Sequence, residues 1–146
     1  LAQLSKSADQ IRVMAYDFHH ADSEPGPVTP LGDLQKVLDT TKKLVPLDKV
    51  VISLPTYGYD WSVKHGEDLQ YADAMKLIKE KNVNYHLDEK EEALTGTYQG
   101  DDGKHVIWFE NSQTLKAKLA MVKKAGFYKI SLWRLGGEDP LTWNTF

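Results

Sequence analysis

The stretch IRVMAYD, residues 11–17, is rich in β-forming residues and almost continuously apolar until it ends in tyrosine and aspartate. Two other segments repeat this plan, KVVISLP at residues 49–55 and YKISLWRL at residues 128–135. Unbroken apolar runs of this length are typical of strands that are covered on both faces, as in parallel sheets. The sequence therefore predicts three neighbouring parallel strands.

Helical patterns connect these segments. Residues 33–45 place apolar side chains largely on one face, with Asp33 as the expected N-cap. Residues 112–126 do the same before the third strand, with Asn111 or Ser112 as the cap and Gly126 as the end. Strand, helix and strand in this order predict right-handed crossovers and an α/β fold.

The long stretch before the last helix has a different pattern. Residues 71–82 predict a short amphipathic helix, and residues 83–89, 93–99 and 104–110 predict short strands. The sequence GDDG at residues 100–103 is a hairpin signal between the last two. We expect an α+β insertion subdomain at residues 62–108 within one domain, residues 1–146, because βα loops normally have only 2–6 residues.

Composition excludes several classes of function. The 146 residues carry a formal net charge of −3, so no basic field attracts nucleic acid or an anionic membrane. No apolar run reaches the roughly 18 residues that a membrane span needs. The absence of cysteine excludes disulfides, thiolate catalysis and Cys-based zinc sites. We expect no nucleic-acid or membrane partner and no cofactor.

Polar and aromatic side chains follow all three predicted strands, and in a parallel sheet they would gather at one edge. They are Tyr16, Asp17, His19, His20, Thr56, Tyr57, Tyr59, Asp60, Trp61, Trp133 and Arg134. Ligands bind at this edge in α/β folds, and rings with carboxylates suit a carbohydrate. The alternative is an ordinary core edge with polar tips in water. A metal at His19, His20, Asp22 and Glu24 is disfavoured because their spacing matches no known ligand pattern.

Three segments together resemble the family 18 glycoside hydrolases, the chitinase family. MAYD at residues 14–17 is similar to the motif that ends the sixth barrel strand, and ISLPTYGYDW at residues 52–61 resembles the seventh-strand segment. Residues 106–140 resemble the end of the insertion, the seventh helix and the eighth strand. YGYDW and LWRLGGEDP resemble the bacterial cell-wall and spore-cortex lytic branch. The resemblance implies strands 6–8 of a TIM (β/α)8 barrel, with a small α+β insertion between strand 7 and helix 7.

The resemblance also implies roles for five residues. Tyr16 and Asp17 would be the catalytic residues, with Tyr16 holding the N-acetyl carbonyl of the sugar at the cleavage point. Met14, Tyr57 and Trp133 would bind substrate, with Trp133 as the floor beneath the ring. The implied reaction is retaining hydrolysis of β-1,4-linked N-acetylglucosamine polymers, peptidoglycan or chitin, in which the substrate's acetamido group replaces an enzyme nucleophile.

The sequence departs from the family at two places. Tyr59 stands where many members have arginine, and the Asp-x-x-Asp-x-Asp-x-Glu motif that carries the general acid is absent. A complete barrel takes about 250 residues, so we expect the C-terminal half of a barrel that is inactive alone and that could self-associate through its open strand edges. An extracellular or cell-envelope location, including a spore or cell wall, is expected. The alternative is a catalytically inactive chitinase-like carbohydrate-binding protein.

Overall fold

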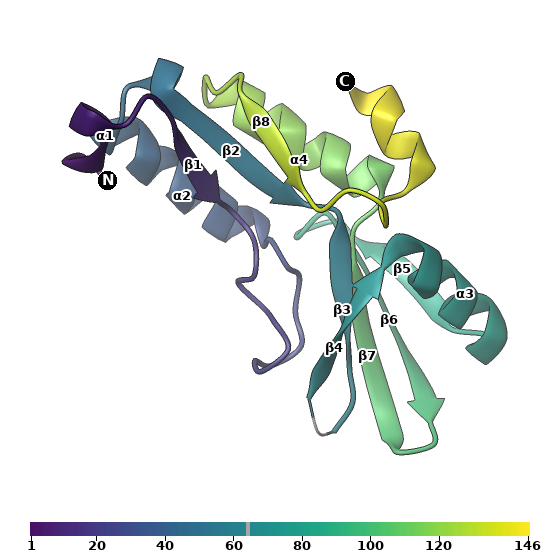
Figure 1. The fold of residues 1–146 in the computed structure, drawn as a ribbon. Helices are drawn as coiled ribbons and strands as arrows, with labels where there is room; N and C mark the ends of the chain where they lie inside the picture. The colour runs from purple at the N-terminus through teal and green to yellow at the C-terminus, as the bar shows by residue number, and fades with distance from the viewer. Residues whose placement is uncertain (64) are drawn as a thin grey trace.

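The computed structural model describes residues 1–63 and 65–146, which form two β-sheets. Three strands make a parallel sheet in the order β1-β2-β8, and five make an antiparallel sheet in the order β4-β3-β7-β6-β5. In Figure 1 the parallel sheet with α2 and α4 occupies one half of the molecule, and the antiparallel sheet with α3 occupies the other. In the described part of the chain, no helix has the length and apolar character needed to cross a membrane.

The parallel sheet confirms the three predicted strands. They are β1 (Ile11–Met14), β2 (Val50–Pro55) and β8 (Ile130–Trp133). In the register, Val13 faces Ile52 and Ile52 faces Ile130, so β2 is the central strand. All six residues of β2 are buried, as the unbroken apolar run predicts. Strands β1 and β8 are shorter than predicted, so Tyr16 and Asp17 lie just beyond β1.

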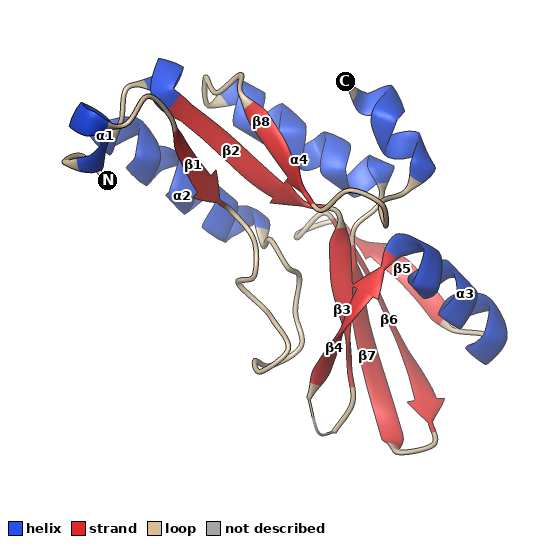
Figure 2. Cartoon of the chain, viewed as in Figure 1, coloured by secondary structure: helices blue, strands red, loops and turns tan. Residues whose placement is uncertain are grey.

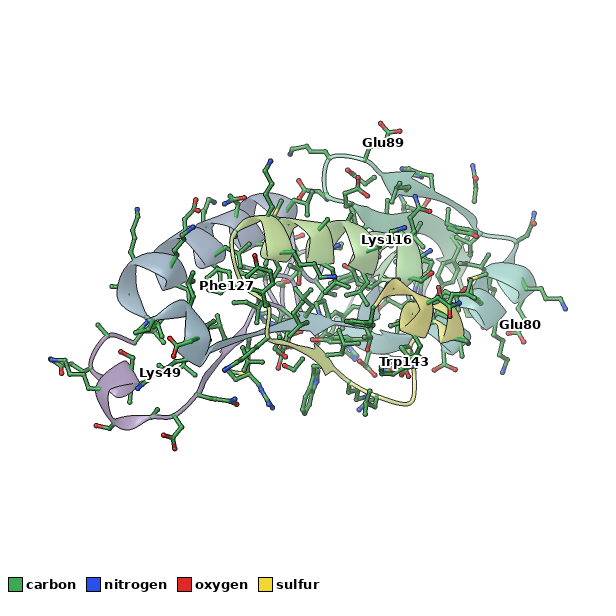
Figure 3. The ribbon with its side chains drawn as sticks, turned by 90° about the horizontal axis from the view of Figure 1, so that it is seen from above. Lys49, Glu80, Glu89, Lys116, Phe127 and Trp143 are labelled. Carbon is green, nitrogen blue, oxygen red and sulfur yellow. The ribbon has the colours of Figure 1, made fainter. Side chains whose placement is uncertain are left out.

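Helices α2 (Leu31–Leu44) and α4 (Ser112–Lys124) lie on the same face of the parallel sheet (Figure 2). The core between them contains Leu34, Leu38, Ile52, Leu54, Leu115, Leu119 and Phe127. Phe127 lies where the chain leaves α4 toward β8 (Figure 3). Short helical turns occur at α1 (Leu4–Ser7), η1 (Leu47–Lys49) and η2 (Pro140–Thr145).

One predicted helix cap is confirmed and the other is wrong. The Asn111 side chain accepts from the Thr114 backbone N–H at 2.9 Å, and Thr114 Oγ1 accepts from the Asn111 N–H, forming a capping box. Helix α2 instead begins after Pro30, and Asp33 lies inside its first turn. There Asp33 pairs with Lys36 at 2.8 Å and still complements the positive end of the helix dipole.

The antiparallel sheet includes the predicted short strands and one hairpin that the sequence did not reveal. Its elements are β3 (Tyr57–Trp61), β4 (Gly66–Gln70), α3 (Tyr71–Lys81), β5 (Asn84–Asp88), β6 (Ala93–Gly100) and β7 (Gly103–Phe109). The predicted turn joins β6 to β7, with Gly103 at φ 130°. Residues of YGYDW, expected to follow the second strand as part of the site, form the separate strand β3. The insertion bounds of 62–108 stay a prediction, since the sheet itself begins at Tyr57.

A glycine sets how closely β3 packs. A Cβ atom on Gly58 would lie 1.9 Å from the Trp108 carbonyl oxygen of β7. Strand β3 pairs with β7 through Tyr59 opposite Trp108. Any side chain at position 58 would therefore push β3 away from β7 and displace the aromatic residues that β3 carries.

A buried ion pair joins the end of the antiparallel sheet to α4. Lys118 Nζ lies 2.8 Å from Glu110 Oε2, and the two side chains are almost completely buried. Lys118 also donates to the Glu92 carbonyl at 2.6 Å, and Thr114 Oγ1 donates to Glu110 at 2.6 Å. Because buried charges need such partners, this network fixes α4 relative to the loop between β5 and β6.

His105 lies between two carboxylates near the far end of the antiparallel sheet. Its Nδ1 is 2.9 Å from Asp60 and its Nε2 is 2.7 Å from Asp102, while its ring stacks on Tyr98. Burial lowers the pKa of His105, but the hydrogen bonds to Asp102 and Asp60 and the charges of both outweigh it and raise the pKa. The protonated ring therefore stabilises this end of the sheet.

This arrangement predicts a pH-dependent stability. Because the folded-state pKa is raised, the stabilisation is complete below the unfolded pKa of about 6.5 and is lost as pH rises through the folded pKa. We expect His105→Gln to lower the free energy of unfolding by about 1 kcal/mol at pH 6 and by less at pH 8.5. Urea unfolding at both pH values measures this, and an equal loss at both would contradict it.

Candidate functional site

Two large apolar side chains are exposed where the parallel strands end. Met14 is the last residue of β1 and is 67% exposed, and Trp133 is the last residue of β8 and is 54% exposed. In the register, Met14 faces Ser53, and Pro55 faces Trp133. Both therefore stand at the carboxyl edge of the sheet, where ligands bind in α/β folds.

Tyr16 links the two sides of this edge. Its ring stacks on Trp133 with centroids 6.5 Å apart and planes 15° apart. It also meets the Tyr57 ring edge to face, with centroids 6.4 Å apart. The structure thus brings together residues from the ends of β1 and β8 and the start of β3, as the strand-end prediction requires.

The backbone at Asp17, beyond the end of β1, departs from the extended conformation of the strand. Asp17 has φ 58°, a left-handed conformation that is uncommon for residues other than glycine. Its Oδ1 atom accepts a short hydrogen bond from the Tyr57 hydroxyl and one of 3.1 Å from the Tyr59 hydroxyl. Two phenols of β3 therefore hold one carboxylate oxygen, an arrangement that strand spacing alone did not predict.

Both phenols remain donors over the physiological pH range. Burial raises the pKa of Tyr57 far above its usual value, and the hydrogen bond and charge of Asp17 raise it further. Burial and the Asp17 charge also raise the pKa of Tyr59, to about 12. The Asp17 carboxylate consequently keeps two protonated partners.

The loop after Asp17 is fastened to the hairpin of β3 and β4. Trp61 Nε1 donates to the His20 carbonyl at 3.1 Å, and the Gly66 N–H donates to the Ala21 carbonyl at 2.7 Å. His19 Nδ1 lies 2.9 Å from the Glu24 carbonyl. In the ranges 1–63 and 65–146, no group of three or more His, Asp or Glu is placed to hold a metal ion.

The segment after β8 is held by β4 and by the residue that precedes β3. Thr56 Oγ1 donates to the Arg134 carbonyl at 2.7 Å, and the Thr56 N–H donates to the Trp133 carbonyl. The Arg134 side chain pairs with Asp68 of β4 at 3.1 Å. The peptide bond between Trp133 and Arg134 is cis. These contacts position the Trp133 ring relative to Tyr16.

Glu138 and Asp139 accept hydrogen bonds from backbone N–H groups in and around the segment that follows β8. Glu138 Oε2 accepts from the Gly136 and Gly137 N–H groups at 2.6 and 3.1 Å. Asp139 accepts from Leu141 N–H at the start of η2 and from Ser112 N–H at the start of α4. Glu138 therefore serves the turn, as its position after two glycines suggests, whereas Asp139 also joins the turn to the start of α4.

The site offers a flat aromatic surface beside an oriented carboxylate. Trp133 and Tyr16 supply rings that can lie against an apolar sugar face. The Tyr16 hydroxyl can donate to a carbonyl, and the carboxylate of Asp17 can accept from a substrate N–H or O–H. This chemistry suits a sugar that carries an amide substituent.

Comparisons with known proteins agree with this chemistry. The family model described as "Glycosyl hydrolases family 18" matches residues 1–138. The uncharacterized glycosylase YvbX of Bacillus subtilis (strain 168) is 32% identical in an alignment that covers 97% of this chain and 42% of the relative.

Two solved structures have closely similar backbones. The spore cortex-lytic enzyme SleL of Bacillus cereus superposes with a TM-score of 0.90 at 25% identity, over 97% of this chain and 35% of that one. A chitinase from Chromobacterium violaceum ATCC 12472 also gives 0.90, at 32% identity, over 99% of this chain and 46% of that one. The chain therefore spans less than half of each of these three proteins, and its α/β fold matches part of their structures. It belongs to family 18 of the glycosyl hydrolases.

Proposed function

We propose that this chain is the C-terminal part of a (β/α)8 barrel, in which β1, β2 and β8 are strands six, seven and eight. The parallel order β1-β2-β8 supports this numbering. So does the share of the SleL and chitinase chains that it covers, 35% and 46%. On this assignment the antiparallel sheet is the insertion between strand seven and helix seven, and the outer edges of β1 and β8 pair with the rest of the barrel or with another copy.

The whole protein then hydrolyses β-1,4-linked N-acetylglucosamine polymers, peptidoglycan or chitin. The single observation that carries this function is the grouping of Tyr16, Asp17 and Trp133 at the carboxyl edge of the parallel sheet. Similar proteins are called a chitinase and a spore cortex-lytic enzyme, which supports both polymers as substrates. The second of these names supports action at a cell envelope or spore.

The proposed chemistry is substrate-assisted and retains the anomeric configuration. The acetamido oxygen of the sugar attacks C1 while the glycosidic oxygen leaves with a proton from a general acid, and water then opens the cyclic intermediate. The Tyr16 hydroxyl holds the acetamido carbonyl for attack, and Asp17 accepts from the same sugar. Met14 packs beneath it, Tyr57 contacts it from the side, and Trp133 forms its floor.

The general acid is absent from this chain in the proposed mechanism. Asp17 is committed to Tyr57 and Tyr59, and Asp68 is paired with Arg134. The isolated chain is accordingly inactive on a chromogenic chitobioside. If the whole protein also lacks a glutamate at the end of an Asp-x-x-Asp-x-Asp-x-Glu segment, the same cradle serves a catalytically inactive carbohydrate-binding protein instead.

Trp133→Ala tests the proposed sugar floor. Because the ring is 54% exposed, its loss should hardly change stability. Removing a stacking surface should weaken binding of N-acetylglucosamine tetramers to the full-length gene product by about tenfold or more. Isothermal titration calorimetry measures the affinity.

Trp143→Ala is the matched control, since Trp143 is 53% exposed and lies in η2. This control should bind the tetramer as the wild type does. A purely structural role for Trp133 would give the opposite pattern, in which stability falls and tetramer affinity is unchanged.

A further inference from the structure

Strand β3 presents three aromatic side chains in alternation, so that they share one face of the strand. The rings of Tyr57 and Tyr59 meet edge to face at 5.7 Å, and those of Tyr59 and Trp61 are tilted at 5.4 Å. Trp61 is only 3% exposed and is itself anchored to the His20 carbonyl. The Tyr59 ring is therefore held between two neighbours, which limits where its hydroxyl can point.

The hydroxyl of Tyr59 points to Asp17. It donates to Oδ1 at 3.1 Å, the same oxygen that the Tyr57 hydroxyl binds. Tyr57 is 4% exposed and Tyr59 is more accessible, so the two donors reach the carboxylate from the buried and the open side. Among the residues that the structure describes, no side chain or backbone group donates to the second oxygen, Oδ2.

We propose that Tyr59 is a positioning residue for the Asp17 carboxylate, which it holds by Oδ1 from the open side so that Oδ2 faces the sugar. This inference rests on the proposed function and adds a residue that the resemblance did not supply. Asp17 needs such support because it lies beyond β1 with φ 58°, where no ladder of strand hydrogen bonds orients it.

A phenol at this position differs chemically from an arginine. A guanidinium would form an ion pair with Asp17 and neutralise much of its charge. The Tyr59 hydroxyl orients the carboxylate without adding a charge, so the full negative charge remains for N–H and O–H donors of the substrate. The raised pKa of Tyr59, about 12, means that the donor proton is retained at any pH at which the protein would act.

The test is Tyr59→Phe in the full-length gene product, which keeps the ring contacts and removes only the hydroxyl. We expect kcat on N-acetylglucosamine oligomers to fall by about tenfold, the usual effect of losing one hydrogen bond to a charged group, with KM changed less than about threefold. In a product that only binds such oligomers, the Kd should rise by about the same factor.

The same substitution in an Asp17→Ala background, where neither phenol has a side-chain acceptor at position 17, separates positioning from general structure. If Tyr59 acts through the Asp17 carboxylate, Tyr59→Phe should change the remaining activity or affinity less than about twofold in that background. Tyr98→Phe is the matched control, because its hydroxyl binds Asp60, away from Asp17. It should resemble the wild type in both backgrounds.

Two results would overturn the role of Tyr59 and leave the proposed function intact. One is a Tyr59→Phe protein with wild-type kcat and Kd, and the other is an equal loss in the presence and absence of the Asp17 carboxylate. A wild-type product that neither hydrolyses nor binds N-acetylglucosamine oligomers would overturn the proposed function, and the inference with it. That failure is seen in the wild type itself and is therefore distinguishable from the other two.

Discussion

Asp17→Asn in the full-length gene product should lower kcat/KM for N-acetylglucosamine oligomers by at least about 100-fold, the scale seen when one oriented polar group at a reacting centre is removed. The asparagine oxygen can still accept from Tyr57 and Tyr59, so the local fold is preserved. The other end of the side chain becomes an NH2 donor without charge, which is wrong for a substrate N–H or O–H. Initial rates on a chromogenic oligomer measure the effect.

Asp39→Asn is the matched control for this substitution. Asp39 lies on the exposed face of α2, accepts from Gln35 at 2.9 Å and belongs to none of the segments that form the site. It should leave kcat/KM within about twofold of the wild type, since surface substitutions rarely perturb a distant site. An Asp17→Asn protein within about threefold of wild-type activity would remove Asp17 from the proposed catalytic machinery.

Lys118→Met should lower the free energy of unfolding by about 3–5 kcal/mol, because it leaves the Glu110 carboxylate buried without its cation. The pair is 2.8 Å apart and both side chains are almost completely buried. The Glu92 carbonyl would also lose its donor from Lys118. Urea unfolding measures the loss.

Two control variants test whether the loss comes from the buried ion pair. Lys116→Met changes an exposed lysine of the same helix (Figure 3) and should alter the free energy of unfolding by less than about 0.5 kcal/mol. Adding Glu110→Leu to Lys118→Met removes the stranded carboxylate and should recover much of the stability. A loss below about 1 kcal/mol for Lys118→Met alone would show that the ion pair does not stabilise the fold as its burial implies.

Sequence patterns predict the strands of the parallel sheet, but they do not predict where the chain leaves this sheet after β2 and enters the antiparallel sheet as β3. The apolar run of β2 is buried along its whole length, and burial on both faces is what such a run indicates. The YGYDW segment mixes aromatic, glycine and acidic residues and follows β2 after a single residue, so the sequence did not show that it forms a strand of a second sheet. The change of sheet at Thr56 depends on tertiary hydrogen bonds to the segment after β8.

The sequence predicts which residues share the site but not the hydrogen bonds between them. Residues at the carboxyl ends of parallel strands must meet at one edge of the sheet, so strand positions alone predict that Tyr16 and Trp133 lie on the same edge. The bonds from Tyr57 and Tyr59 to Asp17 depend on the φ of Asp17 and on the path of β3, neither of which leaves a local sequence signal. The buried pair of Glu110 and Lys118 also could not be anticipated, because Glu and Lys side chains usually face water.

The most direct measurement is the anomeric form of the first product that the full-length gene product releases from an N-acetylglucosamine oligomer. Substrate-assisted hydrolysis in a cradle of Tyr16, Asp17 and Trp133 predicts retention, so proton NMR during the first minutes should show the β-anomer in excess before mutarotation. An initial excess of the α-anomer would show inversion by direct attack of water and would contradict the account, as would a complete absence of hydrolysis.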